Sequence, residues 1–167
     1  MSPDIRLQRW FEAPLDVGFD AYTDPDAQRA LRTGGPDWVL ESECDLRVGG
    51  EWIIRFGPSS APYVDRNVFH AVERSHRLVY ASTTEWPDGS HIESLMEIDL
   101  RWLDGRTLLT LTQREVPSGD LERGFTDGWN ESWTRSWQGS RHGPRPERTE
   151  RTGGSDGQGH VRDVDVA

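Results

Sequence analysis

The chain of 167 residues carries 29 acidic and 19 basic side chains, which gives a net charge of −10 and an isoelectric point near 4.9. This charge argues against nucleic acids and anionic membrane surfaces as partners, because the electrostatic term would repel both. The single cysteine, Cys44, cannot form an internal disulfide, and no long apolar run marks a signal peptide or a membrane span. We expect one domain that acts in the cytoplasm as a monomer or weak dimer.

The start of the chain predicts one strand followed by two helices. Residues 5–12 alternate between apolar and polar side chains until Pro14 ends the strand, because proline cannot donate to a ladder. A short helix is expected over residues 17–22. Pro25 then suits the first turn of a second helix over residues 25–33.

From Trp38 onward the apolar period changes from 3.6 residues to 2, which predicts strands. Short turn sequences such as Asp104-Gly105 separate the runs, and links of this length join antiparallel neighbours. The expected strands cover residues 38–47, 50–57, 63–73, 77–86, 91–103 and 106–115. With the first strand they predict an antiparallel sheet of about seven strands.

One face of this sheet is expected to be buried and the other to be wet. The clearest alternation occurs in the strand over residues 91–103, where mostly apolar side chains occupy every second position. The inward set there is Ile92, Ser94, Met96, Ile98, Leu100 and Trp102. In the same register, the strand over residues 50–57 places Trp52, Ile54 and Phe56 inward, and the strand over residues 106–115 places Leu109, Leu111 and Gln113 inward. A sheet with one apolar face needs a cover.

A long C-terminal helix over residues 118–137 is the predicted cover. Large apolar residues recur at four-residue intervals and form one stripe on a helix of 3.6 residues per turn: Leu121, Phe125, Trp129, Trp133 and Trp137. The small residues beside this stripe permit either close approach to the sheet or open space beneath the helix: Gly124, Gly128, Ser132 and Ser136. Residues 139–160 contain no aromatic or aliphatic side chain, so we predict a folded domain over 1–138 and a disordered tail over 139–167.

Several short motifs accompany this order of elements. They are Arg9 with Ala13-Pro14, Val17-Gly18-Phe19-Asp20-Ala21-Tyr22-Thr23-Asp24-Pro25, Asp45-Leu46-Arg47-Val48-Gly49-Gly50-Glu51-Trp52, Arg77-Leu78-Val79-Tyr80, Thr110-Leu111-Thr112-Gln113 and Gly128-Trp129. With these motifs the chain resembles the START-like (SRPBCC) superfamily, and within it the branch named after activators of the ninety-kilodalton heat-shock protein ATPase. The resemblance implies an α+β helix-grip fold, in which a curved antiparallel sheet wraps around a long C-terminal helix and leaves a cavity between them.

Side chains from both the sheet and the helix would line such a cavity. The predicted apolar lining is Trp38, Trp52, Phe56, Tyr80, Met96, Phe125, Trp129 and Trp133, and core packing is the alternative role for each. Polar side chains on the buried face are more informative, because a buried donor needs a partner that a ligand could supply. These candidates are His70, Ser82, Ser94 and Gln113. The pattern around His70 leaves open which face of its strand is buried.

Catalytic motifs are scarce in the sequence. The five histidines lack the spacing of metal ligands, and neither a nucleophile elbow nor a phosphate-binding glycine loop occurs. The sequence therefore favours a domain that binds a hydrophobic or amphipathic small molecule without a metal or cofactor. The resemblance keeps two alternatives open. One is a cyclase or aromatase of polyketide assembly, or a self-resistance protein that captures a natural product. The other is a module that contacts a chaperone, although that role in eukaryotic relatives goes with an additional domain.

Overall fold

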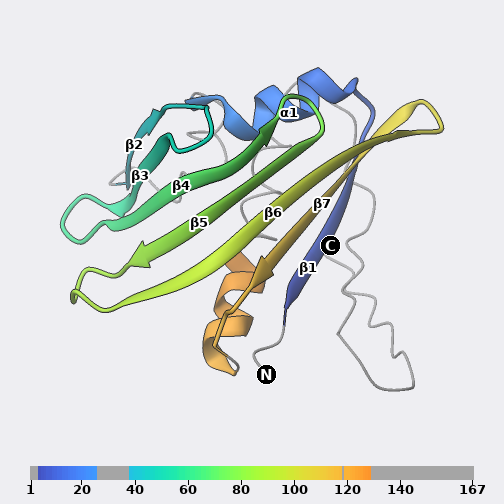
Figure 1. Cartoon of the computed structure of the whole chain (residues 1–167). Coiled ribbons are helices and arrows are strands. Elements are labelled where there is room, and N and C mark those ends of the chain that lie inside the picture. The colour runs from blue at the N-terminus through green and yellow to red at the C-terminus, as the bar shows by residue number, and fades with distance from the viewer. Residues whose placement is uncertain (1–3, 26–37, 118, 129–167) are drawn as a thin grey trace.

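The computed structural model describes residues 4–25, 38–117 and 119–128 of the chain. Within these ranges seven antiparallel strands form one curved sheet (Figure 1). The strands are β1 Ile5–Phe11, β2 Trp38–Cys44, β3 Glu51–Pro58, β4 Tyr63–Glu73, β5 Arg77–Glu85, β6 His91–Leu103 and β7 Arg106–Arg114. The helix α1 covers Leu15–Thr23, and a further helix occupies residues 120–128. The predicted sheet and the first short helix are confirmed.

Three predictions fall wholly or partly outside the described residues. The second helix, expected over residues 25–33, lies almost wholly in this category. So do residues 129–167, which contain the rest of the predicted C-terminal helix and the predicted tail. The helix expected over residues 118–137 is therefore described for residues 120–128.

The strand order is β1-β7-β6-β5-β4-β3-β2, so every strand from β2 to β7 pairs with its neighbour in sequence. The tightest link joins β6 to β7, where Leu103 pairs with Arg106 across a two-residue turn. Asp104 and Gly105 both have positive φ, at 53° and 77°. Such a turn matches the twist of the two strands, and aspartate followed by glycine adopts it readily. The connection from β1 to β2 instead crosses from one edge of the sheet to the other and contains α1.

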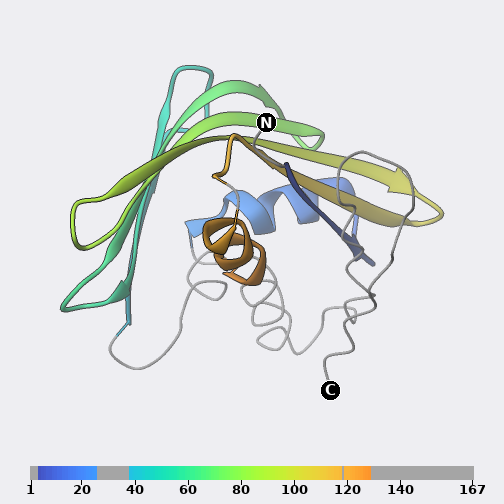
Figure 2. The same ribbon diagram turned by 90° about the horizontal axis from the view of Figure 1, so that it is seen from below.

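The sheet bends over both helices, which lie on its concave side (Figure 2). Phe19 of α1 is fully buried, and Tyr22 one turn later is 6% exposed. A Cβ atom at Gly18 would lie 3.3 Å from Cδ2 of Leu100, so glycine at this position allows α1 to approach the sheet closely. The buried apolar residues of α1, Phe19 and Tyr22, are thus the ones whose spacing in the sequence predicted one apolar face of a helix.

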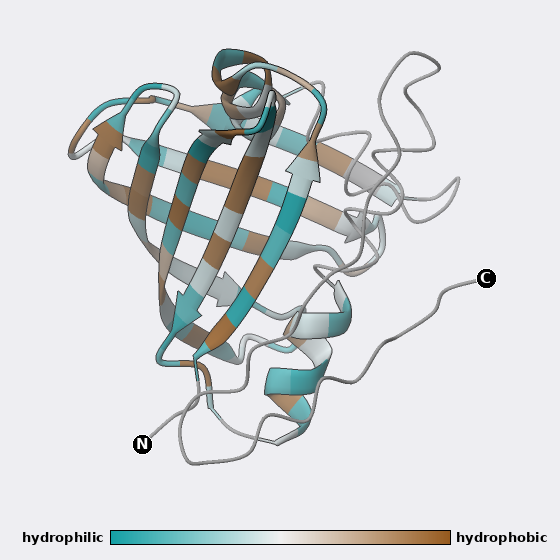
Figure 3. Cartoon of the chain, turned by 90° about the vertical axis from the view of Figure 1, so that its right-hand side faces the viewer, coloured by the Kyte–Doolittle hydropathy of each residue, from teal (hydrophilic) through white to brown (hydrophobic). Residues whose placement is uncertain are grey.

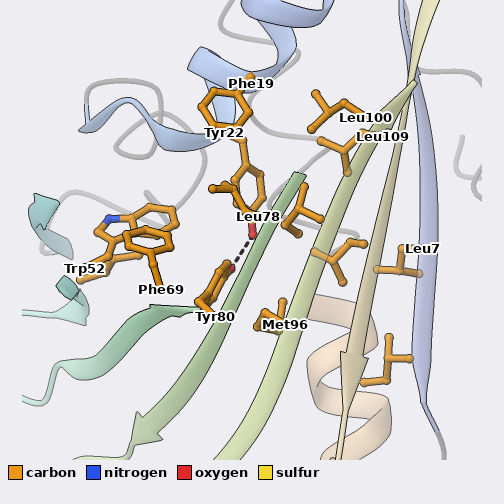
Figure 4. Close-up of a cluster of buried hydrophobic side chains, with 14 of the residues drawn as sticks. Leu7, Phe19, Tyr22, Trp52, Phe69, Leu78, Tyr80, Met96, Leu100 and Leu109 are labelled. Atoms are coloured by element: carbon orange, nitrogen blue, oxygen red, sulfur yellow. Dashed lines mark hydrogen bonds between the residues drawn. The ribbon is translucent and has the colours of Figure 1, made fainter. Parts of the chain in front are cut away.

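The main core lies at the α1 end of the concave face (Figure 4). Trp52 is 1% exposed and stacks on Phe69, with ring centroids 6.1 Å apart. Tyr22 and Tyr80 each meet the Trp52 ring edge to face at 6.0 Å. Contacts of this kind add to the free energy gained by burying the rings themselves.

Hydropathy alternates along the strands, as the predicted one-sided sheet requires (Figure 3). On β6 the inward positions from Ser94 to Leu100 are buried. The prediction that Trp102 also faces the core is wrong, because its side chain is 49% exposed. The β6–β7 hairpin extends beyond the part of the sheet that α1 covers (Figure 1), so no other described element forms a layer over the residues near its tip.

Candidate functional site

A pocket of about 440 Å³ lies between the concave face of the sheet and the helix at residues 120–128. This volume is within the usual range for small-molecule sites. The described residues that line it are Trp38, Ile54, Phe56, Tyr63, Asp65, Asn67, Tyr80, Ser82, Thr84, Trp86, Met96, Gln113, Asp120, Leu121, Gly124, Phe125 and Gly128. The pocket is thus built by strands β2 to β7, the segment after β5 and the C-terminal helix.

Buried polar side chains form a continuous band on the concave face at this pocket. We call it the polar band, and its members are Asp65, Asn67, Ser82, Thr84, Ser94 and Gln113, each between 2% and 8% exposed. Strand pairing explains its continuity, because Asn67 lies opposite Ser82 and Ser82 lies opposite Ser94. Asp65 lies opposite Thr84 in the next row. The polar band therefore crosses several strands rather than following one.

Hydrogen bonds fix most side chains of the polar band. The Thr84 hydroxyl donates to Oδ1 of Asp65 over 2.8 Å, and Nε2 of Gln113 donates to the Ser94 hydroxyl over 3.0 Å. Nδ2 of Asn67 donates to the backbone carbonyl of Trp52 over 2.9 Å. Because these bonds orient the groups before any ligand arrives, the pocket is pre-organised for polar recognition.

Aromatic rings form the walls next to the polar band. Phe56 and Tyr63 stack with centroids 5.5 Å apart across the β3–β4 pair. Trp86, which follows β5, meets Phe125 of the C-terminal helix edge to face at 6.2 Å. This contact joins the sheet side of the pocket to the helix side. The site combines large apolar walls with a few placed polar groups, as ligand pockets commonly do.

The structure brings most of the predicted site residues together. Those that line the pocket are Trp38, Phe56, Tyr80, Ser82, Met96, Gln113 and Phe125. Ser94 is not among the lining residues, but it lies opposite Ser82 and accepts the hydrogen bond from Gln113. Trp129 and Trp133 lie outside the described residues.

Two predicted residues lie elsewhere. His70 is exposed, because β4 alternates with Asp65, Asn67 and Phe69 on the buried face. His70 therefore does not line the pocket. Trp52 belongs to the adjacent core, where its indole nitrogen donates to the Ser42 hydroxyl over 3.0 Å.

The polar residues of β4 and their neighbours are not among the site residues predicted from the sequence. Asp65, Asn67 and Thr84 line the pocket together with Tyr63 and Trp86. The sequence does contain a signal for Asp65 and Asn67, because the predicted register places Ile54 on the buried face. Ile54 pairs with Asp65, and opposed residues of antiparallel strands share a face. Extending the hairpin register by one strand would have identified Asp65 and Asn67.

Two of the described residues that line the pocket are charged, and both are acidic: Asp65 and Asp120. Asp120 forms an ion pair with Arg123 in the same helix. Arg9 also faces the concave side and is 7% exposed, and burial lowers its pKa to about 10. It remains charged at neutral pH but is absent from the pocket lining. Within the described ranges, no group of three or more histidine, cysteine, aspartate or glutamate side chains could hold a metal ion.

A curved antiparallel sheet that bends over helices and leaves a lined pocket beside one of them defines a START-like domain. Residues 12–136 match the family described as activator of Hsp90 ATPase homolog 1-like protein, and the chain belongs to this family. A search of curated proteins found no match. No helix in the described part of the chain is long and apolar enough to cross a membrane.

Solved structures share the fold at low sequence identity. Protein CV1439 from Chromobacterium violaceum is 23% identical with a TM-score of 0.68, over 80% of this chain and 94% of that one. The HSP90 activator PFC0360w from Plasmodium falciparum is 21% identical with a TM-score of 0.60, over 78% and 89%. DynU16, from the dynemicin biosynthetic locus, is 19% identical with a TM-score of 0.62, over 80% of this chain and 45% of that one.

Proposed function

We propose that this protein binds a hydrophobic or amphipathic small molecule in the pocket between the sheet and the C-terminal helix. The observation that carries the proposal is the pocket of about 440 Å³, in which aromatic walls adjoin the buried polar band. The walls offer apolar area to a ligand, and the polar band offers directional hydrogen bonds.

The position of the polar band supports a binding role over a purely structural one. Burying polar groups costs free energy unless they are hydrogen-bonded, so a sheet face that served only stability would do better with apolar residues. The concave face has such residues at its α1 end, where Leu78, Ile98 and Leu111 lie side by side on neighbouring strands. The six residues of the polar band gather at the pocket end instead, whereas Arg9 and Thr107 are buried polar residues outside the pocket. The two ends of one face thus differ in chemistry as a binding site and a core would.

A thermal-shift screen with hydrophobic and amphipathic compounds tests the proposal, followed by native mass spectrometry of any complex. A ligand that binds only the folded state stabilises it by RT ln(1 + L/Kd), where L is the free ligand concentration, so the unfolding temperature rises with the ligand concentration. The Gln113→Leu variant should weaken binding of polar ligands by about tenfold, as loss of one good hydrogen bond predicts. Gln8→Leu is the matched control, because Gln8 lies on the outer face and donates to Thr110. Equal binding by both variants would count against a role for Gln113.

An enzyme is the second candidate, and the observation that favours it is the carboxylate of Asp65 in the pocket. A carboxylate that lines an apolar pocket is placed to accept a proton from a bound substrate, as a cyclase of polyketide assembly would require. DynU16 shares the fold, which makes a biosynthetic role worth testing. The test is mass spectrometry of compounds incubated with the protein. Turnover that Asp65→Asn abolishes while binding persists would support an enzyme, and unchanged compounds would support binding alone.

Capture of a natural product for self-resistance would use the same pocket without turnover. Neighbouring genes for natural-product assembly would support this form of the proposal, and expression of the protein should then raise tolerance to the product.

Contact with an Hsp90-type chaperone is a further candidate, which the fold shared with PFC0360w suggests. Co-purification with a chaperone and stimulation of its ATPase would support that role.

A further inference from the structure

We propose that the pocket selects neutral amphipathic ligands whose polar group both donates and accepts hydrogen bonds, as a carboxamide does. Asn67 and Ser82 are the residues that recognise this group. The inference rests on the proposed function, because it names the class of ligand for the same pocket. It follows from two neighbouring buried side chains whose hydrogen-bonding capacity the described part of the protein leaves unused.

Asn67 of β4 and Ser82 of β5 lie directly opposite each other, and both line the pocket. They are 3% and 8% exposed. Opposed side chains of an antiparallel pair share a face, and their Cβ atoms lie about 5 Å apart. The two side chains can therefore contact one polar group of a ligand at the same time.

The Asn67 carboxamide makes one hydrogen bond within the described part of the chain. Its Nδ2 donates to the backbone carbonyl of Trp52 over 2.9 Å. A carbonyl oxygen only accepts, so the amide nitrogen must face Trp52 and Oδ1 takes the other position. A carboxamide has two N–H donors and one carbonyl acceptor. One N–H and Oδ1 thus remain available for a ligand.

The Ser82 hydroxyl makes no hydrogen bond to any described residue, although more than nine-tenths of Ser82 is buried. Two positions along the same strand, the Thr84 hydroxyl donates to Asp65 and is satisfied. Buried polar groups nearly always have a hydrogen-bond partner, so each exception calls for an explanation. The position of Ser82 and Asn67 at the pocket supplies one, because a bound ligand can be the missing partner.

A ligand that fills this part of the pocket displaces water from both side chains. A purely apolar ligand would leave the hydroxyl and Oδ1 without a partner, which costs free energy. A carboxamide restores the bonds, since its N–H donates to Oδ1 of Asn67 and its carbonyl accepts from the Ser82 hydroxyl. Neither residue carries a charge, so neither can compensate the desolvation of a charged group. The pair therefore favours a neutral polar group.

Pyrenecarboxamide and acetylpyrene test this selectivity, because they share one apolar body, nearly the same shape and a carbonyl acceptor. Only the carboxamide also has N–H donors. Binding is measured through energy transfer from tryptophan to pyrene, since Trp38 and Trp86 line the pocket. We expect the parent protein to bind the carboxamide about five- to tenfold more tightly than the ketone, as one additional hydrogen bond predicts.

Asn67→Leu removes the acceptor for the ligand N–H with little change in size, and should reduce this preference to about twofold or less. Ser82→Ala removes the donor to the carbonyl that both probes share, so it should weaken both by about threefold or more. It should also leave the midpoint of urea unfolding unchanged or raise it, because it removes a buried hydroxyl that has no partner.

Thr83→Val is the matched control, since Thr83 is the next residue of β5 and lies on the outer face of the sheet. It should bind both probes as the parent protein does. Asn67→Leu also removes the donor to the Trp52 carbonyl, so circular dichroism and acetylpyrene binding check its fold and pocket. Should this variant fail to fold, equal binding of the carboxamide by Ser82→Ala and Thr83→Val overturns the inference.

The outcomes separate the two proposals. A carboxamide preference that Asn67→Leu removes, together with weaker binding of both probes by Ser82→Ala, supports the inference. Equal binding of the two probes by the parent protein overturns it and leaves the proposed function standing. A lower unfolding midpoint of Ser82→Ala does the same, because it would show that the hydroxyl already has a partner within the chain. Failure of the folded parent protein to bind either probe counts against both proposals.

Discussion

The phenol oxygens of Tyr22 and Tyr80 lie 2.7 Å apart and form a hydrogen bond between α1 and β5 (Figure 4). Tyr80 packs against Trp52 on one side and lines the pocket on the other. The bond therefore ties the helix to the sheet at the boundary between core and pocket. Its position gives a direct way to ask whether the two regions are energetically coupled.

Replacing either tyrosine by phenylalanine should lower the free energy of unfolding by about 1 kcal/mol, because the remaining buried hydroxyl loses a partner. The double variant should cost less than the sum of the single variants, since it removes both polar groups at once. Urea unfolding of the four proteins measures the coupling energy. Strict additivity would show that the hydrogen bond contributes nothing to stability.

Trp52→Ala should destabilise the protein by about 3 to 5 kcal/mol, because it opens a large cavity among Phe69, Tyr22 and Tyr80. Trp102→Ala provides the matched control, since Trp102 is 49% exposed and should change stability by no more than about 0.5 kcal/mol. Chemical unfolding at one temperature compares them. Similar losses from both substitutions would contradict the assignment of Trp52 to the core.

Gly124→Phe should block ligand binding without weakening the fold. Gly124 lines the pocket, and a Cβ atom there would meet no atom within 4 Å, so a larger side chain can enter the open space. The substitution should leave stability unchanged or raise it by up to about 1 kcal/mol, because glycine is unfavourable inside a helix. Titration with any ligand found in the thermal-shift screen measures the effect.

The control for this substitution is Asp127→Phe, at an exposed position of the same helix that does not line the pocket. It should bind ligand as the parent protein does. Undiminished binding by Gly124→Phe would show that the ligand occupies another site.

Cys44 should react slowly with thiol reagents. Burial, with a smaller contribution from Asp45, raises the pKa of its thiol from 9.0 to about 11. The thiolate is the reactive form, so its fraction at pH 8 should be roughly a hundredfold smaller than for a thiol with the ordinary pKa. The rate of alkylation by iodoacetamide, compared between native protein and protein in guanidinium, measures this. Equal rates would contradict it.

The raised pKa of Cys44 also makes the free energy of unfolding depend on pH. The folded state holds the thiol proton more tightly than the unfolded state does. The contribution is therefore fully present below pH 9 and is lost as the pH rises towards 11. Comparing the alkaline unfolding of the parent protein with that of Cys44→Ala isolates it.

The sequence by itself determined the sheet. Alternation at every second residue and short turns such as Asp104-Gly105 specify neighbouring antiparallel strands, because side-chain period and turn length are local properties. It also determined that Gln113 and Ser94 face inward, since both interrupt otherwise apolar rows. The family followed from motifs that are contiguous in the chain.

Only the tertiary structure decided the chemistry of the pocket. Whether Asp65 or Arg66 faces the concave side depends on pairing with β3 and β5, and a shift of one residue reverses every side chain of a strand. Strand pairing placed Asp65 beside Thr84, and His70 lies outside because β4 alternates with Asp65, Asn67 and Phe69 inward. Partners on neighbouring strands are distant in sequence, so local patterns could not establish which residues of β4 face inward.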